Sequence, residues 1–173
     1  MGTSSLRIEA GGTVSALIAA NPVGNALTPD GKHFWAAPFE IQNEFGGYGV
    51  SQNITSSLGI DQSKLGALNP QANTTIGVVA TDFELDKAEL KRLALAAHDG
   101  LARAIYPSHL PYDGDLIFAV STGKIEKPKD PVLLSTLSSA AAHCVARAVA
   151  RGVYHAQAED GDLKPTARQL IDG

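Results

Sequence analysis

The chain is poor in cysteine, in charge and in aromatic residues. Its single cysteine, Cys144, cannot form an internal disulfide framework, and such scarcity is typical of a reducing compartment. Cys144 falls in an apolar run, where we expect a small core residue, because no base stands at a spacing that would indicate a nucleophile. Only 18% of the 173 residues are charged, the net charge is −4, and Lys and Arg are spread along the chain. This excludes a basic face for nucleic acid and a polybasic membrane patch.

Sequence patterns of several common classes are also absent. There is no basic N-terminal region followed by an apolar core, and no apolar stretch is expected to reach the ~18–20 residues of a membrane span, so we expect a cytoplasmic protein. Gly-x-Ser-x-Gly, Walker and dinucleotide-binding patterns do not occur, which leaves an α/β-hydrolase, an ATPase and a Rossmann enzyme without support. The five histidines form no ligand pattern, and the sequence indicates no cofactor.

Three short apolar runs predict strands. Residues 14–20, 75–81 and 116–120 are apolar at successive positions, which is typical of strands covered on both faces. Two helices are also expected. One follows Asp86, which with Glu89 forms a capping box, and the other begins at Asp130-Pro131 and runs to about Tyr154. Together these elements predict an α/β fold with layers of helix, sheet, sheet and helix.

The segment Asn73-Thr74-Thr75 stands directly before the second predicted strand. A hydroxyl at Thr74 could attack the preceding peptide bond, and the Thr74 amine released in this way could then act as the base for the same hydroxyl. Two plainer interpretations compete. Asn-Thr-Thr is common in loops, and it matches the N-glycosylation pattern, as does Asn53-Ile54-Thr55; without a secretory signal, glycosylation is disfavoured.

Two further segments hold polar residues at strand ends. Asp113-Gly114-Asp115 precedes the third strand, where both carboxylates could hold an amine or hydroxyl near a nucleophile. A turn with two solvated acids and a divalent-metal site are the alternatives, although no further ligand stands at motif spacing. Asn21 follows the first strand, before Pro22, and its amide could donate to an oxyanion or merely form a turn.

These blocks, in this order, resemble the DmpA / L-aminopeptidase D-esterase family. Its members are self-processing N-terminal-nucleophile hydrolases and include the β-peptidyl aminopeptidases and the nylon-oligomer hydrolases. The resemblance covers about Thr3 to Tyr154, and its most diagnostic stretches are residues 73–81, 97–105 and 113–120. It implies an αββα sandwich, cleavage between Asn73 and Thr74, and an active site of Thr74, Asn21, Asp113 and Asp115 that needs no cofactor and no metal.

The resemblance also implies how the chain is divided. Residues 1–173 form a single domain, the C-terminal part of the family fold. Residues 1–73 are the end of the α-subunit portion with a long loop over 22–73, residues 74–155 are the β-subunit portion, and residues 156–173 are a polar tail.

Family members are about twice as long as this chain, and the missing half precedes Met1. In the family that half supplies a lysine and an aromatic residue of the active site, and we expect nothing in this chain to replace them. The implied substrates are short peptides with a free amino terminus, amino-acid amides or esters, β-peptides and linear aminohexanoate oligomers. The expected partner is a homo-oligomer or the missing half. The alternative is a non-catalytic or incomplete, oligomer-forming fragment of such an enzyme.

Overall fold

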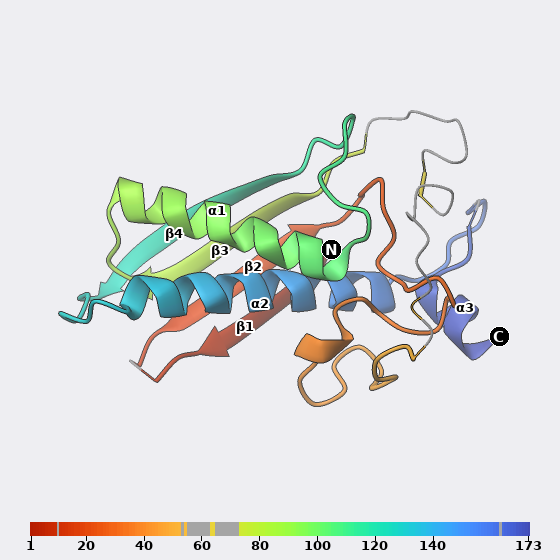
Figure 1. The fold of residues 1–173 in the computed structure, drawn as a ribbon, viewed down its shortest axis with the longest axis horizontal. Helices are drawn as coiled ribbons and strands as arrows, with labels where there is room; N and C mark the ends of the chain where they lie inside the picture. Colours follow the sequence, from red (N-terminus) through yellow and green to blue (C-terminus); the bar gives the residue numbers. More distant parts are fainter. Residues whose placement is uncertain (10, 53, 55–62, 65–72, 163) are drawn as a thin grey trace.

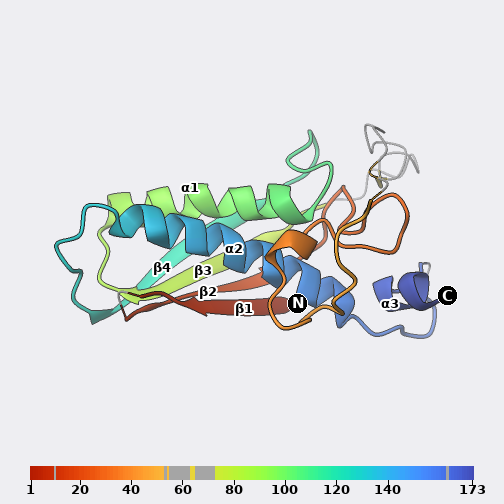
Figure 2. The same cartoon turned by 60° about the horizontal axis from the view of Figure 1, so that its bottom comes forward.

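A four-stranded sheet with two long helices on one face organises the chain (Figures 1 and 2). The computed structural model describes residues 1–9, 11–52, 54, 63–64, 73–162 and 164–173. Its strand order is β1-β2-β3-β4. The elements are β1 (Gly2–Arg7), β2 (Thr13–Ala19), the 3₁₀ turn η1 (Ala37–Phe39), β3 (Ile76–Phe83), α1 (Lys87–Ala104), β4 (Leu116–Ile125), α2 (Leu133–Tyr154) and α3 (Ala167–Asp172).

The topology brings three chain segments to one end of the sheet. β2 pairs antiparallel with β3, so that Ala19 at the end of β2 lies opposite Ile76 at the start of β3. β3 and β4 are parallel, as expected for strands joined through a helix, and Ile76 lies opposite Leu116 at the start of β4. The residues just beyond these positions therefore meet at the end of the sheet drawn on the right in Figure 1.

One face of the sheet is buried and the other is exposed. Val14, Ile18 and Val79 point to the helices and are fully buried, whereas Leu17 and Phe118 on the opposite face are 44% and 54% exposed. The prediction that the strands are covered on both faces is therefore wrong for this chain. The described part of the chain forms one sheet and one helix layer of the predicted helix, sheet, sheet, helix arrangement. A second sheet is not among the described residues.

The predicted elements are present, with small shifts at their ends. Asp86 caps α1 in the expected box: its side chain accepts from the Glu89 N–H at 2.8 Å, and Glu89 accepts from the Asp86 N–H. α2 begins two residues later than predicted, because Asp130 accepts from the Val132 N–H in a turn ahead of the helix. Strand β1 and helix α3 were not predicted.

Helix α2 reaches the length of a membrane span, although no apolar stretch of the chain was expected to do so. By length and composition alone it could span a membrane, but two-thirds of its apolar window is buried within the fold. It packs along β1, β2 and α1, so it is the core helix of this structure. Cys144 lies on its buried side and donates to the Val14 carbonyl, as expected for a small core residue.

A buried ion-pair cluster anchors the long segment after β2 to α2. Glu44 accepts from Arg147 through both carboxylate oxygens and from Arg151, while Arg147 also donates to the Ser5 carbonyl of β1 at 3.0 Å. Burial opposes the charge of Glu44, but the hydrogen bonds from the two arginines outweigh it and lower the pKa of the carboxyl. The cluster thus ties β1, α2 and residues 40–47 into one unit.

Candidate active site

The residues predicted to react lie together at the shared end of β2, β3 and β4. Asn73 forms an isolated parallel bridge with Asp113. The Thr75 carbonyl accepts from the Leu116 N–H at 2.9 Å, which continues the pairing of β3 with β4 to this edge. On the other side, the Asn21 carbonyl accepts from the Thr74 N–H at 3.0 Å. Thr74 is thus held between the end of β2 and the start of β4.

The Thr74 hydroxyl contacts the carbonyl group of the peptide bond that it is predicted to cut. Thr74 Oγ1 donates to the Asn73 carbonyl oxygen at 2.6 Å, so the hydroxyl and this carbonyl are already in contact. The Gly114 N–H donates to the same oxygen at 3.0 Å. A carbonyl that accepts two donors is polarised toward attack, and negative charge that develops on its oxygen would be stabilised.

Gly114 is required at its position by the closeness of the two segments. A Cβ added to Gly114 would lie 2.8 Å from Thr74 Oγ1, closer than real Cβ contacts, and 3.6 Å from the Asn73 oxygen. Glycine lets the backbone N–H approach the scissile carbonyl. The oxyanion role was predicted for Asn21 and not for the Gly114 N–H. The glycine between two aspartates is the sequence feature that could have indicated a close approach of the backbone N–H at this position.

Asp113 and Asp115 flank Gly114 and hold neighbouring main-chain groups. Asp115 accepts from the Thr75 N–H at 3.0 Å, and Asp113 accepts from the Val23 N–H at 3.2 Å. Burial is the main cause that raises the pKa of Asp113, and the adjacent Asp115 carboxylate raises it further, against the effect of the Val23 N–H. Within the described residues, Asp113 Oδ1 and Asp115 Oδ2 have no hydrogen-bond donor. A proton shared by the two acids, or an incoming ammonium group, would satisfy these oxygens.

A histidine that was not predicted to belong to the site contacts this acid pair. His109 Nδ1 lies 3.0 Å from Asp115 Oδ2; His109 is 38% exposed, and the Asp115 side chain only 2%. The contact is electrostatic and not an aligned hydrogen bond, since Oδ2 has no donor within the described part of the chain. The His109 ring packs on that of His98, 5.2 Å away, and burial followed by the charge of His109 lowers the pKa of His98.

Asn21 contributes its side chain as well as its carbonyl. Its Oδ1 accepts from Lys64 Nζ at 2.5 Å. No residue of this chain was expected to take the place of the family's lysine. Lys64 lies in a segment without periodicity or a recognisable motif, so no sequence pattern indicates it. The structure nevertheless brings a lysine to the asparagine of the candidate site.

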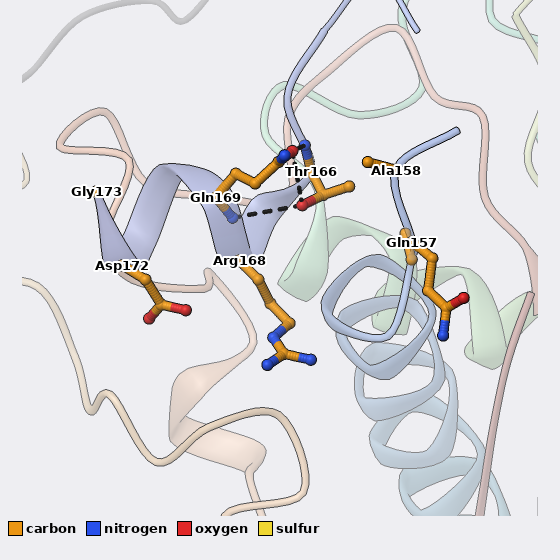
Figure 3. Close-up of a pocket in the computed structure, with 8 residues that line it drawn as sticks. Gln157, Ala158, Thr166, Arg168, Gln169, Asp172 and Gly173 are labelled. Atoms are coloured by element: carbon orange, nitrogen blue, oxygen red, sulfur yellow. Dashed lines mark hydrogen bonds between the residues drawn. The ribbon is translucent and has the colours of Figure 1, made fainter. Parts of the chain in front are cut away.

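The glycosylation and metal interpretations can be compared with the positions of the described residues. Asn73 is 5% exposed, which leaves its amide poorly accessible for glycosylation, and Asn53 and Thr55 of the second pattern lie outside the described residues. No group of three or more His, Cys, Asp or Glu side chains that could hold a metal ion occurs within the described residues. A separate hollow around α3, lined by Gln157, Arg168 and Asp172 among others, contains none of the predicted site residues (Figure 3).

Comparisons with known proteins show which proteins the chain is similar to. The pattern of peptidase family S58 matches residues 1–166. An uncharacterised aminopeptidase of Mycobacterium bovis is 40% identical over 183 residues, which cover 100% of this chain and 52% of the relative. The 6-aminohexanoate-oligomer endohydrolase of Kocuria is 39% identical over 59 residues, which cover 34% of this chain and 17% of that enzyme. The chain thus spans about half the length of the aminopeptidase that it matches throughout.

A solved structure shows the same fold. The L-aminopeptidase D-Ala-esterase/amidase of Ochrobactrum anthropi, described as a variant of the Ntn hydrolase fold, has a TM-score of 0.57 at 23% identity. The match covers 94% of this chain and 42% of that chain. It confirms the predicted fold class, of which this chain holds about half. The family pattern and the sequence relatives together establish that the chain belongs to peptidase family S58.

Proposed function

We propose that the protein is a self-processing amide hydrolase of the N-terminal-nucleophile type, with Thr74 as the nucleophile after cleavage of the Asn73-Thr74 bond. The observation that carries the proposal is the contact of Thr74 Oγ1 with the Asn73 carbonyl oxygen at 2.6 Å, together with the Gly114 N–H on the same oxygen. A hydroxyl held beside the scissile carbonyl and a backbone donor on the carbonyl oxygen are two of the elements that acyl transfer requires.

The first reaction is intramolecular. Thr74 Oγ1 attacks the carbonyl carbon of Asn73, its proton passes to the Thr74 nitrogen, and the C–N bond breaks to leave an ester between the two residues. Water then hydrolyses the ester, which frees the Asn73 carboxylate, the Thr74 hydroxyl and the Thr74 amine. The fragments are residues 1–73 and 74–173. The Asn21 carbonyl, which accepts from the Thr74 N–H before cleavage, would hold the new amine in place.

The second reaction uses the freed Thr74 on an external amide. Its amine takes the hydroxyl proton while the oxygen attacks the substrate carbonyl, and then passes this proton to the substrate nitrogen as the C–N bond breaks and the amine product leaves. Water hydrolyses the remaining ester, which releases the acid product and restores the Thr74 hydroxyl. The Asn21 amide and the Gly114 N–H would stabilise the oxyanion. The partly buried acid pair Asp113 and Asp115 would position the Thr74 amine or bind an ammonium group of the substrate.

The proposed substrates are amides with a free amino group nearby. Short peptides, amino-acid amides or esters, β-peptides and linear aminohexanoate oligomers all fit two aspartates beside an N-terminal threonine. The aminopeptidase and aminohexanoate-oligomer hydrolase relatives support this range. The reaction needs no cofactor, and we propose a cytoplasmic location.

A pair of isosteric variants tests the nucleophile. Thr74→Val removes the predicted nucleophilic hydroxyl, whereas Thr75→Val removes the adjacent one, whose oxygen is buried without a hydrogen-bond partner among the described residues. Intact-mass measurement should show the two fragments for the parent and for Thr75→Val, and a whole chain for Thr74→Val. Cleavage of Thr74→Val at the parental rate would refute the assignment of Thr74.

A second candidate function is that of a non-catalytic or incomplete fragment that forms oligomers. The exposed apolar face around Leu17 and Phe118 favours it, because a bare sheet face of this kind usually finds a partner. Size-exclusion chromatography and an aminopeptidase assay on the chain alone, and on the chain joined to any sequence encoded upstream, separate the two functions. We expect the chain alone to associate and to be weakly active. A monomer as active as the longer form would show that no further half is needed.

A further inference from the structure

Lys64 binds the turn that follows β2 through both its main chain and its side chain. Its main-chain N–H donates to the Val23 carbonyl at 2.9 Å, and its ammonium donates to Asn21 Oδ1 at 2.5 Å. Asp113 binds the same turn through its contact with the Val23 N–H at 3.2 Å. Lys64 and Asp113 thus hold residues 21–23 between them.

The charges around Lys64 come from two other segments. Partial burial is the main cause that lowers the pKa of Lys64, the like charge of Lys164 lowers it further, and the Asp113 carboxylate raises it. An ammonium that is partly desolvated and faces one acid makes a stronger hydrogen bond to a neutral amide oxygen than a fully hydrated one does. The contact to Asn21 is exposed, and the partial burial of Lys64 strengthens it.

The chemistry of the two groups fixes the orientation of the Asn21 amide. An ammonium can only donate, so its partner atom on Asn21 must be the oxygen Oδ1. The NH₂ end of a planar amide then points away from Lys64. For an amide that is to stabilise an oxyanion, the NH₂ end is the one that must face the reacting carbonyl.

We propose that Lys64 is a positioning residue of the active site, which holds the Asn21 amide with its donor end toward the Thr74 reaction centre. This inference rests on the proposed function. Lys64 and Asn21 both precede the Asn73-Thr74 bond, whereas the nucleophile follows it. After cleavage the positioning pair and the nucleophile belong to different fragments, so the fragments must remain together for the site to work.

Three lysine variants test the proposal. Lys64→Met removes the donor and keeps most of the side-chain length, Lys64→Arg restores a cationic donor, and Lys91→Met is the control on an exposed position of α1. The rate of cleavage and the kcat and KM for an aminoacyl amide are measured in whichever form, alone or with upstream sequence, is found to cut. Lys64→Met should reduce both the cleavage rate and kcat by about tenfold to a hundredfold, less than complete removal of an oxyanion donor, with KM little changed. Lys64→Arg should recover most of the loss.

A spectroscopic readout separates positioning from folding. The side-chain amide signals of Asn21, assigned by their disappearance in Asn21→Asp, should move in Lys64→Met and stay in place in Lys91→Met. Parental rates in Lys64→Met, or an Asn21 signal that does not respond to it, overturn the proposal alone, since Thr74 would still cut. If no form of the parent cuts, the proposed function falls, and the role of Lys64 falls with it.

Discussion

The substitution Gly114→Ala places one methyl group against the proposed nucleophile. The new Cβ would lie 2.8 Å from Thr74 Oγ1, while ordinary contacts begin at 3.4 Å, so the two atoms must separate by about half an ångström. The Asn73 oxygen, at 3.6 Å, is already at an ordinary distance. Gly114 does not have a positive φ, so alanine brings no backbone strain. The perturbation is therefore directed at the hydroxyl.

The expected loss follows from the two contacts on the Asn73 oxygen. Threonine is stiff about χ1, so a displaced hydroxyl turns into another rotamer and loses the 2.6 Å contact instead of shifting slightly. If the Gly114 N–H also moves, the second donor weakens. A misplacement of this kind or the loss of one oxyanion donor costs about 10² in rate, so cleavage should slow by about a hundredfold.

Intact-mass time courses of Gly114→Ala, with thermal melting as the check on folding, measure this effect. The melting temperature should change little, because the reduced entropy of the unfolded chain offsets part of the steric strain between the new methyl group and the Thr74 side chain. In a Thr74→Ser background the same substitution should cost less, since serine lacks the γ-methyl group and its hydroxyl can rotate more freely. A folded Gly114→Ala protein that cuts at the parental rate would refute the geometry on which the proposed mechanism rests.

Three further substitutions separate catalysis from stability. Asp113→Asn should abolish activity but melt at the same or a higher temperature at pH 7. The pKa of Asp113 is raised in the folded parent, so ionisation of this carboxyl destabilises the parental fold as pH rises. Any gain in melting temperature of the variant should therefore vanish below pH 3.8, the ordinary pKa, where the parental carboxyl is protonated in both states. A lower melting temperature at pH 7 would instead make Asp113 structural. His109→Gln should raise the pKa of Asp113 further, because the charge of His109 lowers it, and should move the acid limb of the pH–rate profile to higher pH; an unmoved limb would contradict the coupling. Glu44→Ala should lower the free energy of unfolding by about 3 kcal/mol in urea titrations, because Arg147 stays buried without its partner. Lys127→Gln, at an exposed pair, is its control and should change little.

The predictable parts of the fold are those with local signals. Asp86 and Glu89 form a capping box within four residues and so predict the start of α1. The apolar runs of β2, β3 and β4 are bounded by polar segments and so predict strands. β1 carries no such signal. Its inward positions are Gly2, Ser4 and the partly buried Leu6, and the first two are small because α2 passes so close that a Cβ on Gly2 would lie 1.9 Å from the Ala148 carbonyl oxygen. Close packing there removed the alternation of apolar side chains by which a strand is recognised.

The site was partly predictable for a related reason. Thr74, Asp113 and Asp115 directly precede strands, and Asn21 follows one, so parallel and antiparallel pairing could bring all four to one edge. Lys64 was not predictable, because its approach to Asn21 depends on the path of a long segment without local order in its sequence. A contact between residues 43 positions apart leaves no periodic trace.

The exposed apolar face continues into the candidate site. Strand pairing aligns Ala19, Ile76 and Leu116 in one row on that face, and Ile76 and Leu116 are 49% and 46% exposed. Ile76 lies two residues after Thr74, and Leu116 directly follows Asp115. Any layer that covers this row also forms a wall next to the nucleophile and its acid pair.

Covering the sheet and completing the site are therefore coupled physically. A covering layer would remove water from the Thr74 reaction centre, which strengthens the attraction between the carboxylates, the amine and the developing oxyanion. It would also hide apolar side chains that otherwise drive association. Both candidate functions thus depend on what covers this face, and in any form that cuts, the rate of cleavage should rise with the fraction of chains in which the face is covered.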